Sequence, residues 1–95
     1  MKGYVVCVYK SISNEEKLKE YAVKAKAAVE KYKGIFLIRG GKTTTNEGNR
    51  SPRTVVIEFP SYGEANLFYN SKEYQDAHKI LKGHALRHHQ TIEGT

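Results

Sequence analysis

Arg39 and Glu58 are the residues whose type and surroundings best suit binding chemistry. Arg39 is a charged residue directly after the apolar segment 35–38. Glu58 is the one charged residue within the apolar segment 55–59. An arginine fork binds carboxylates through two parallel N–H donors. On adjacent antiparallel strands, Arg39 would hold a substrate carboxylate or enolate, with Glu58 as general base or orienting group. The alternative is a cross-strand ion pair that only fixes the register.

Three further features extend the candidate ligand site. Gly40 and Gly41 follow Arg39, and a glycine pair there indicates either a β-bulge or a backbone that another group approaches closely, such as an anion on its N–H groups. Tyr21 and Tyr74 lie on apolar helix faces, where they are either core tyrosines with satisfied hydroxyls or residues that line a cavity. The candidate ligand-binding set is therefore Arg39, Gly40, Gly41, Tyr21 and Tyr74.

The four histidines do not form a recognisable metal motif. His88 and His89 alternate along a predicted strand, so their rings point to opposite faces and do not readily share one metal. His78 and His84 are expected at exposed positions, and Cys7 is expected to be an inert core thiol. We therefore predict no metal and no cofactor.

The elements that must position these residues can be traced along the chain. The alternation in 3–9 predicts a first strand, apolar on both faces and therefore central. A helix is expected from a capping box at Ser13 and Glu16 to a terminator at Gly34, with one apolar stripe. The segment 35–39 predicts a second strand, extended by 42–45, and 53–59 predicts a third strand antiparallel to it across a turn at 46–49.

The second half of the chain predicts a broken helix and a last strand. Phe59-Pro60 ends the third strand, and Ser61 with Glu64 predicts a helix start. That helix runs from 61 to 69, Ser71 begins a further segment to about Lys82, and Gly83 ends it. The polar segment 86–93 is expected to be an edge strand or a strand that lines a wet surface.

The order β-α-β-β-α-β is that of an α+β, ferredoxin-like fold. We predict one domain over residues 1–95, a four-stranded antiparallel sheet with the helices on one face. Apolar side chains on the other face of the first and third strands indicate that a second copy of the chain covers it, giving a homodimer through the sheet face.

Composition restricts the classes of function. The net charge is +6 and the pI is about 9.5, which attracts anions, but acidic residues alternate with the basic ones, so a solvated basic surface is favoured over a nucleic-acid site. The single cysteine fits a reducing compartment, and no apolar run approaches the roughly 20 residues of a membrane span. We expect a cytoplasmic protein without a membrane partner.

The chain resembles a bacterial family of unknown function, numbered thirteen-thirty, in the dimeric α+β-barrel superfamily. The resemblance implies a dimer whose sheets face each other around a cavity. Relatives in the superfamily include cofactor-independent monooxygenases, muconolactone isomerases, haem-degrading enzymes and chlorite dismutases, while the family itself has no established activity. The matching residues are Gly3-Tyr4, Tyr21, Arg39-Gly40-Gly41, Val56 to Ser61, Ala65, Tyr69, Ser71, Glu73-Tyr74-Gln75 and Ile92-Glu93-Gly94.

Two positions depart from the family's pattern. Its usual glycine pair after the first helix is Lys33-Gly34 here, and its usual arginine near the end of the second helix is Leu81. A role of that arginine in binding an anion or pairing with a carboxylate would be lost or altered in this chain.

These observations lead to one main hypothesis and two alternatives. The protein is expected to bind a small organic molecule in a cleft between sheet and helices, with turnover by proton transfer or cofactor-independent oxidation left open. The first alternative is a non-enzymatic dimeric binding or interaction module. The second and less favoured alternative is nucleic-acid binding.

Overall fold

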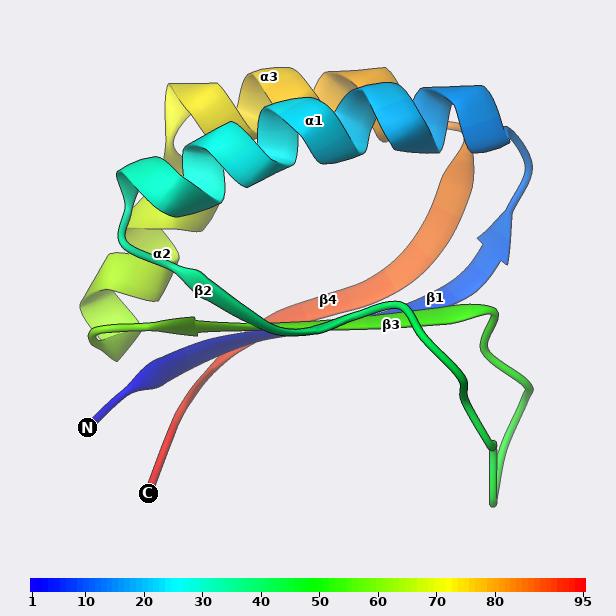
Figure 1. Ribbon diagram of the computed structural model, residues 1–95, viewed down its shortest axis with the longest axis horizontal. Helices are drawn as coiled ribbons and strands as arrows, with labels where there is room; N and C mark the ends of the chain where they lie inside the picture. The colour runs from blue at the N-terminus through cyan, green and yellow to red at the C-terminus, as the bar shows by residue number, and fades with distance from the viewer.

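Four antiparallel strands form one sheet in the computed structural model, which describes residues 1–95 (Figure 1). They are β1 (Gly3–Ile12), β2 (Ile35–Arg39), β3 (Arg53–Phe59) and β4 (Ala85–Glu93), in the order β2-β3-β1-β4. Strand β1 is therefore central and β4 is an edge strand, as the sequence predicted. The four-stranded, ferredoxin-like sheet is confirmed.

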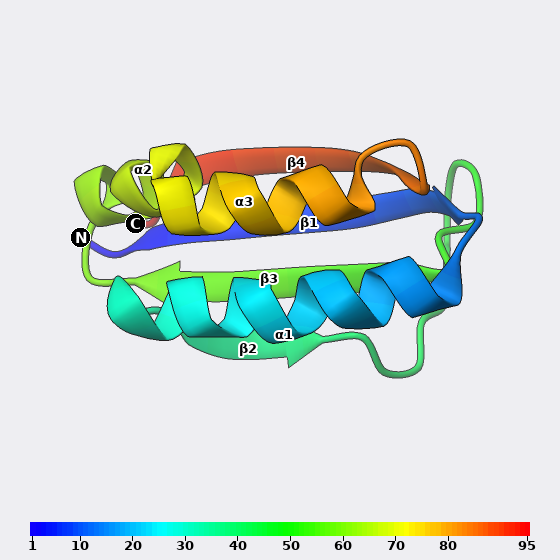
Figure 2. The ribbon, with the colours of Figure 1, turned by 90° about the horizontal axis from the view of Figure 1, so that it is seen from above.

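Three helices cover one face and one end of this sheet. Helices α1 (Glu15–Lys31) and α3 (Lys72–Leu81) lie side by side above it, and α2 (Tyr62–Asn70) lies at the end where the termini meet (Figures 1 and 2). The interruption expected before Ser71 divides the last helical segment, so the order is β-α-β-β-α-α-β. No helix is long and apolar enough to cross a membrane.

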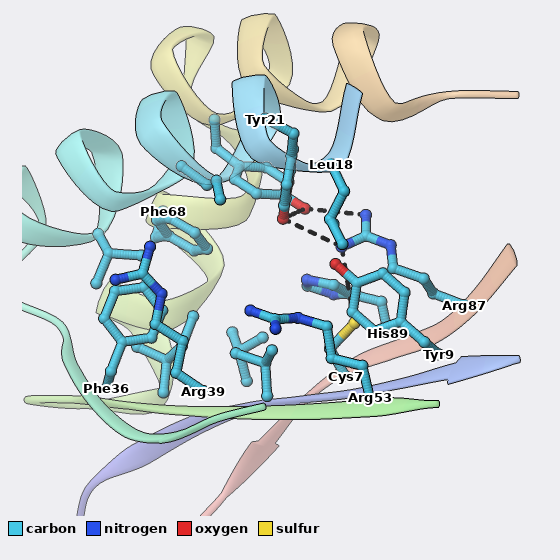
Figure 3. Close-up of a pocket in the computed structure, with 17 residues that line it drawn as sticks. Cys7, Tyr9, Leu18, Tyr21, Phe36, Arg39, Arg53, Phe68, Arg87 and His89 are labelled. Carbon is cyan, nitrogen blue, oxygen red and sulfur yellow. Dashed lines mark hydrogen bonds between the residues drawn. The ribbon is translucent and has the colours of Figure 1, made fainter. Parts of the chain in front are cut away.

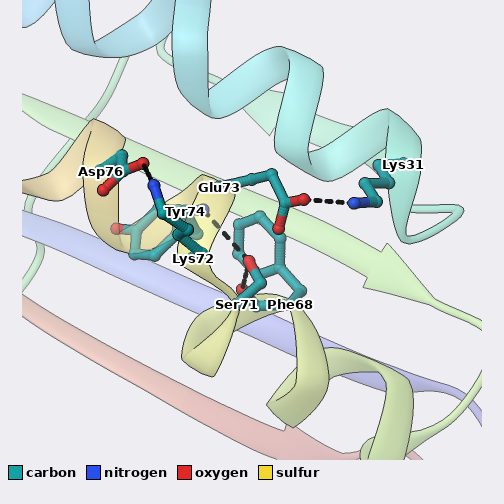
Figure 4. A network of polar contacts seen from close by, with 7 residues as sticks. All are labelled: Lys31, Phe68, Ser71, Lys72, Glu73, Tyr74 and Asp76. Atoms are coloured by element: carbon teal, nitrogen blue, oxygen red, sulfur yellow. Dashed lines mark hydrogen bonds and ion pairs between the residues drawn. The ribbon is translucent and has the colours of Figure 1, made fainter.

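The starts of α2 and α3 follow the predicted capping residues. The Ser61 hydroxyl accepts a hydrogen bond from the Glu64 backbone N–H at 3.1 Å, and the Ser71 hydroxyl accepts one from the Tyr74 N–H at 3.1 Å. The Ser71 hydroxyl also donates to the Phe68 carbonyl at 2.7 Å, which ties the end of α2 to the start of α3 (Figure 4). Side chains thus satisfy backbone groups that helix ends leave open.

Ion pairs on the outer surface of the helix layer complete the contact between α1 and α3. Lys31 near the end of α1 pairs with Glu73 in the first turn of α3 (Figure 4). Within α3, the Lys72 ammonium lies 2.6 Å from the Asp76 carboxylate. These pairs are solvent-exposed, so each contributes little to stability.

The predicted ends of α1 are wrong by one residue. Asn14, not Ser13, is the N-cap, because its side-chain oxygen accepts from the Lys17 N–H at 3.0 Å. The Ser13 hydroxyl instead donates to the His84 carbonyl at 3.0 Å. At the other end Lys33 takes the left-handed conformation, with φ 65°, that was expected of Gly34.

Gly34 has a different role. A Cβ at this position would lie 2.7 Å from Val29 Cγ1 and 2.8 Å from Phe59 Cε1. Gly34 therefore allows the end of α1 to approach the sheet closely as the chain enters β2.

The predicted extension of the second strand over 42–45 is also wrong. Strand β2 ends at Arg39, and the connection that follows projects from the sheet on the side away from the helices (Figure 1). Gly40 and Gly41 have φ values of 78° and 94°, which turn the chain out of the sheet. The irregularity in the β2–β3 pairing lies between Phe36 and Ile38 instead of at the glycines.

The core lies between the sheet and the helices, and the opposite sheet face is open. Val5, Cys7 and Tyr9 of β1 are buried against the helices, whereas Tyr4, Val6 and Val8 on the other face are only partly covered. In the single chain, the predicted cover on both faces of β1 is therefore present on one face only. The remaining buried core residues are Leu18, Tyr21, Ala25, Ala28, Val29, Val55, Ile57, Phe59, Ala65, Phe68, Tyr74, Ala77 and Leu81.

Candidate functional site

A hollow of about 40 Å³ lies between the helix-facing side of the sheet and α1, and most of its lining is apolar. Space of this size holds roughly three water molecules. Its polar lining consists chiefly of three arginines from three strands, Arg39, Arg53 and Arg87, with the hydroxyls of Tyr21 and Tyr74 (Figure 3).

The strand register explains why Arg53 and Arg87 meet. Both lie opposite Tyr9 of the central strand, Arg53 on β3 and Arg87 on β4. Directly opposed residues of antiparallel strands share a face, and Tyr9 faces the helices. Their guanidinium carbons lie 6.0 Å and 5.4 Å from the centroid of the Tyr9 ring. Two guanidinium groups from neighbouring strands thus lie close to the same aromatic ring, that of Tyr9.

The Arg87 guanidinium is held by a network of uncharged groups. It donates to the Tyr21 hydroxyl at 3.1 Å, to the Tyr74 hydroxyl at 3.2 Å and, more weakly, towards Cys7 Sγ at 3.7 Å. The two hydroxyls lie 2.9 Å apart, and their rings meet edge to face. A hydroxyl has one proton, so with Arg87 donating to both oxygens one tyrosine O–H is left to donate to another acceptor.

The protonation states of this network follow from burial. Although burial disfavours its charge, the neighbouring oxygens of Tyr21 and Tyr74 raise the pKa of Arg87 above its ordinary value. Burial also raises the pKa of Tyr21 well above the ordinary value, and it raises that of Tyr74. At neutral pH the network is a guanidinium cation with two neutral phenols, and its one free tyrosine O–H suits an anionic ligand.

Arg53 is the least satisfied member of the site. Its Nε atom is buried and has no hydrogen-bond partner. A Cβ at Gly40 would lie 2.7 Å from Arg53 Nη1, so the missing side chain of Gly40 leaves room for this guanidinium. A buried donor without a partner costs free energy, which an acceptor on a ligand would recover.

Arg39 lies at the other end of the hollow. Its guanidinium carbon is 4.4 Å from the centroid of the Phe36 ring, a cation–π contact on the same strand (Figure 3). None of the protein's five ion pairs includes Arg39, Arg53 or Arg87, and no carboxylate lines the hollow. The site is therefore cationic and lacks an internal counter-ion.

His89 of β4 also lines the hollow, as an uncharged group. Burial, and next the charge of Arg87, lower the pKa of His89 to about 3. Its ring packs 5.1 Å from the ring of Tyr69 and 5.9 Å from that of Tyr74. His88 lies on the opposite face and is exposed, so the two rings point apart as the alternation predicted. No group of three or more His, Cys, Asp or Glu side chains is placed to hold a metal ion.

The structure brings together three of the residues proposed from the sequence. Arg39, Tyr21 and Tyr74 all line the hollow. Gly40 and Gly41 do not line it, and the Gly40 N–H already donates to the Thr54 carbonyl at 2.9 Å, so it is not free for a ligand.

Glu58 does not join this group, and the predicted Arg39–Glu58 pair does not form. Arg39 lies opposite the buried Val55 on the helix-facing side, whereas Glu58 lies opposite Tyr4 and Ile35 on the open face. The Tyr4 hydroxyl donates to Glu58 Oε1 at 3.1 Å. The irregularity between Phe36 and Ile38 shifts the alternation of β2, so Arg39 faces the helices and Glu58 faces the open side.

Sequence reasoning did not identify Arg53, Arg87 or His89 as site residues. The alternation of side chains between the two faces of a strand would have identified them. Arg53 shares a face with Val55 and Ile57 of β3, and Arg87 shares one with His89 of β4. The polar character of 86–93 concealed this, because it suggested an edge strand or a strand on a wet surface instead of one whose alternate residues face the helices.

The sequence model of one family matches residues 2–95, and that family is described as Domain of unknown function (DUF1330). Among curated proteins the comparison found no match.

Several solved structures share the fold. A protein of unknown function from Rhodopseudomonas palustris is 11% identical, with a TM-score of 0.78 over 99% of this chain and 82% of that one. A dimeric ferredoxin-like protein of unknown function from Jannaschia sp. is 11% identical, with a TM-score of 0.78 over 99% of this chain and 100% of that one. A candidate antibiotic biosynthesis monooxygenase from Caulobacter crescentus is 11% identical, with a TM-score of 0.58 over 99% and 89%. At these identities the likeness is one of fold.

Proposed function

The chain belongs to the family described as Domain of unknown function (DUF1330), and from that premise we propose that it binds a small organic anion in the hollow beneath α1. The observation that carries the proposal is the convergence of Arg39, Arg53 and Arg87 on one apolar hollow that contains no carboxylate. A family of unknown function gives no ligand by analogy, so the chemistry of the hollow decides the class.

The charges of the hollow favour a ligand with a carboxylate. Arg53 and Arg87 are partly removed from water without a counter-ion and carry an unrecovered desolvation cost, whereas Arg39 is exposed. A ligand carboxylate recovers part of that cost through charge-assisted hydrogen bonds, which are about twice as strong as neutral ones. Arg87 and the free tyrosine O–H beside it supply such donors in a fixed arrangement.

The lining and the size of the hollow define the rest of the ligand. Apolar side chains such as Val55, Ile57 and Phe68 favour a hydrocarbon or aromatic body. The space of about 40 Å³ accommodates a carboxylate-sized group. The body of the ligand then extends towards Arg39, the exposed member of the three arginines.

Binding is favoured over turnover by the groups available. Tyr21 and Tyr74 have raised pKa values and His89 a lowered one, so none of them is an effective base at neutral pH. The carboxylate of Glu58, the base suggested by the sequence, lies on the other side of the sheet. The residues of the hollow hold and orient an anion.

Turnover is the second candidate, and one observation favours it. Arg87 with the two tyrosine hydroxyls forms a fixed set of donors, which would stabilise negative charge on an enolate oxygen during proton transfer or cofactor-independent oxidation. The fold likeness to the candidate monooxygenase from Caulobacter crescentus agrees with this chemistry.

The protein is also proposed to work as a homodimer through the open sheet face. Ile35, Ile38 and Ile92 are 59%, 46% and 49% exposed, and the register places them on that face with Val6 and Val56. An apolar surface of this kind is typical of an interface. The Jannaschia protein with the same fold is described as dimeric.

A thermal-shift panel tests the binding proposal. Benzoate, phenylacetate and hexanoate at millimolar concentration are expected to raise the melting temperature of the wild type, since a ligand that binds only the folded state stabilises it. Arg87→Met is expected to abolish the rise. Arg50→Met is the matched control, because it removes one positive charge outside the hollow. Equal responses in both variants would show that the carboxylates act through general charge, and the proposal would fail.

A further inference from the structure

The cationic groups of the hollow lie in two places. Arg53 and Arg87 flank Tyr9, one on each neighbouring strand. Their guanidinium carbons lie 6.0 Å and 5.4 Å from the centroid of this one ring. Arg87 also holds both tyrosine hydroxyls, so this end offers more hydrogen-bond donors than the rest of the hollow.

Arg39 forms the second place. It is opposite Val55, and its guanidinium is turned back over Phe36, which is opposite Ile57. Ile57 is four residues along β3 from Arg53, a separation on the order of 13 Å in a strand. Figure 3 shows the Arg39 guanidinium against Phe36 at one end, Arg87 beside Tyr21 at the other, and the Arg53 guanidinium reaching between them.

Apolar side chains separate the two cationic places. On the sheet side of the hollow, Val55 and Ile57 of β3 lie between the Tyr9 end and the Phe36 end. Phe68 of α2 lines the hollow from the helix layer. None of these side chains competes with the arginines for a charge. Apart from the Arg53 guanidinium, the surface between the Arg87 end and the Arg39 end is apolar and suits a hydrocarbon spacer.

From this arrangement we infer that the physiological ligand is a dianion, a dicarboxylate with an apolar spacer. One carboxylate is bound by Arg87, Arg53 and a tyrosine hydroxyl, and the other by Arg39. This assignment rests on the proposed function, since it names the class of anion that the hollow beneath α1 takes.

The absence of any carboxylate in the lining of the hollow supports the inference. A monocarboxylate bound at the Tyr9 end engages Arg87 and Arg53 but leaves Arg39 without a counter-ion. A second carboxylate at the Phe36 end neutralises it. Three guanidinium groups with no internal carboxylate are better matched by two ligand charges than by one.

Calorimetric titration with matched acids tests the inference. The probes are the straight-chain dicarboxylates from succinate to sebacate, each compared with the monocarboxylate of the same carbon number, at one ionic strength. The proteins are the wild type, Arg39→Met and the control Arg50→Met. For the wild type we expect tighter binding of the dicarboxylate, by about ten-fold at the best chain length, as expected of an added charge-assisted contact. Arg39→Met is expected to remove this preference, and Arg50→Met to retain it.

The outcomes distinguish a failure of organic-anion binding from a failure of the dianion assignment. Binding of neither series would overturn the proposed function itself. Equal affinity for matched mono- and dicarboxylates, or equal loss of both in Arg39→Met, would leave organic-anion binding standing and overturn the dianion assignment. A preference that falls equally in Arg39→Met and Arg50→Met would show general attraction to a protein of net charge +6, and would also overturn it.

Discussion

Arg87 on β4 donates to the hydroxyl of Tyr21 on α1 across 3.1 Å, which joins the edge strand to the helix that covers the hollow. Tyr21→Phe removes this acceptor and the hydrogen bond to Tyr74. We expect the free energy of unfolding to fall by about 2–4 kcal/mol, because one neutral hydrogen bond and one from a charged donor are lost. Benzoate affinity should fall less than in Arg87→Met, because the guanidinium remains.

Urea unfolding and calorimetry measure the two effects of Tyr21→Phe. Tyr62→Phe is the matched control, since Tyr62 is 45% exposed and lies outside the hollow. An affinity in Tyr21→Phe equal to that of the wild type would contradict a positioning role for Tyr21.

Glu58→Gln is expected to leave carboxylate binding unchanged. Glu58 faces away from the hollow, and the glutamine oxygen can still accept the hydrogen bond from Tyr4. Calorimetry with benzoate on Glu58→Gln and Arg87→Met, side by side, measures the contrast. A loss of affinity in Glu58→Gln would place a binding role on the open face and contradict the site described above.

Lys33→Gly is expected to stabilise the protein by roughly 0.5–1 kcal/mol. Lys33 adopts a φ of 65° at the end of α1, a conformation that costs a residue with a Cβ more than it costs glycine. Chemical denaturation measures the gain, and Lys33→Ala is the control, because alanine removes the charge but keeps the Cβ. A gain of equal size in Lys33→Ala would assign the effect to charge instead of backbone conformation.

The buried His89 should make stability depend on pH. Its folded-state pKa is about 3, below the ordinary value near 6.5, because of burial and the charge of Arg87. Between these values the unfolded state binds more protons, so the free energy of unfolding falls as the pH drops from about 6.5 towards 3. Burial also lowers the pKa of His78, which adds to the same trend.

His89→Gln isolates the part of this dependence due to His89. Between pH 7 and pH 5 the wild type should lose about 2 kcal/mol more stability than His89→Gln. Urea unfolding at the two pH values is the measurement, and His84→Gln, outside the hollow, is the control. A parallel loss in wild type and His89→Gln would mean that folding does not lower the pKa of His89.

We expect the open sheet face to form the interface of the homodimer. Val6 lies at its centre, opposite Val56 on β3 and Gln90 on β4. Val6→Lys should convert a dimer to monomers in light scattering, because a buried unpaired charge is costly in an interface. Val23→Lys is the control, since Val23 is 72% exposed on α1. A dimeric Val6→Lys protein would exclude the sheet face as the interface.

Much of the fold could be predicted from the sequence because local signals agree with it. Ser61 and Ser71 cap the helices they were expected to cap, and Phe59 ends β3 where Pro60 follows. The errors lie where two candidates are adjacent. Asn14 replaced Ser13 as a cap, and Lys33 took the conformation expected of Gly34, because tertiary contacts decide between neighbours.

The candidate site was harder to predict, because it depends on which face each strand residue occupies. Placing Arg39 beside Glu58 required a register that the irregularity between Phe36 and Ile38 changes. The roles of Arg53 and Arg87 depend on both lying opposite Tyr9, a relation between three strands that no local pattern contains.

Nuclear magnetic resonance of the side-chain Nε–Hε groups of the arginines tests the central claim most directly. Titration of the isotope-labelled protein with millimolar benzoate should shift the Arg53 and Arg87 signals in a saturable way and leave that of Arg50 unchanged. Shifts that are absent, or equal at Arg50 and Arg87, would contradict an anion site beneath α1.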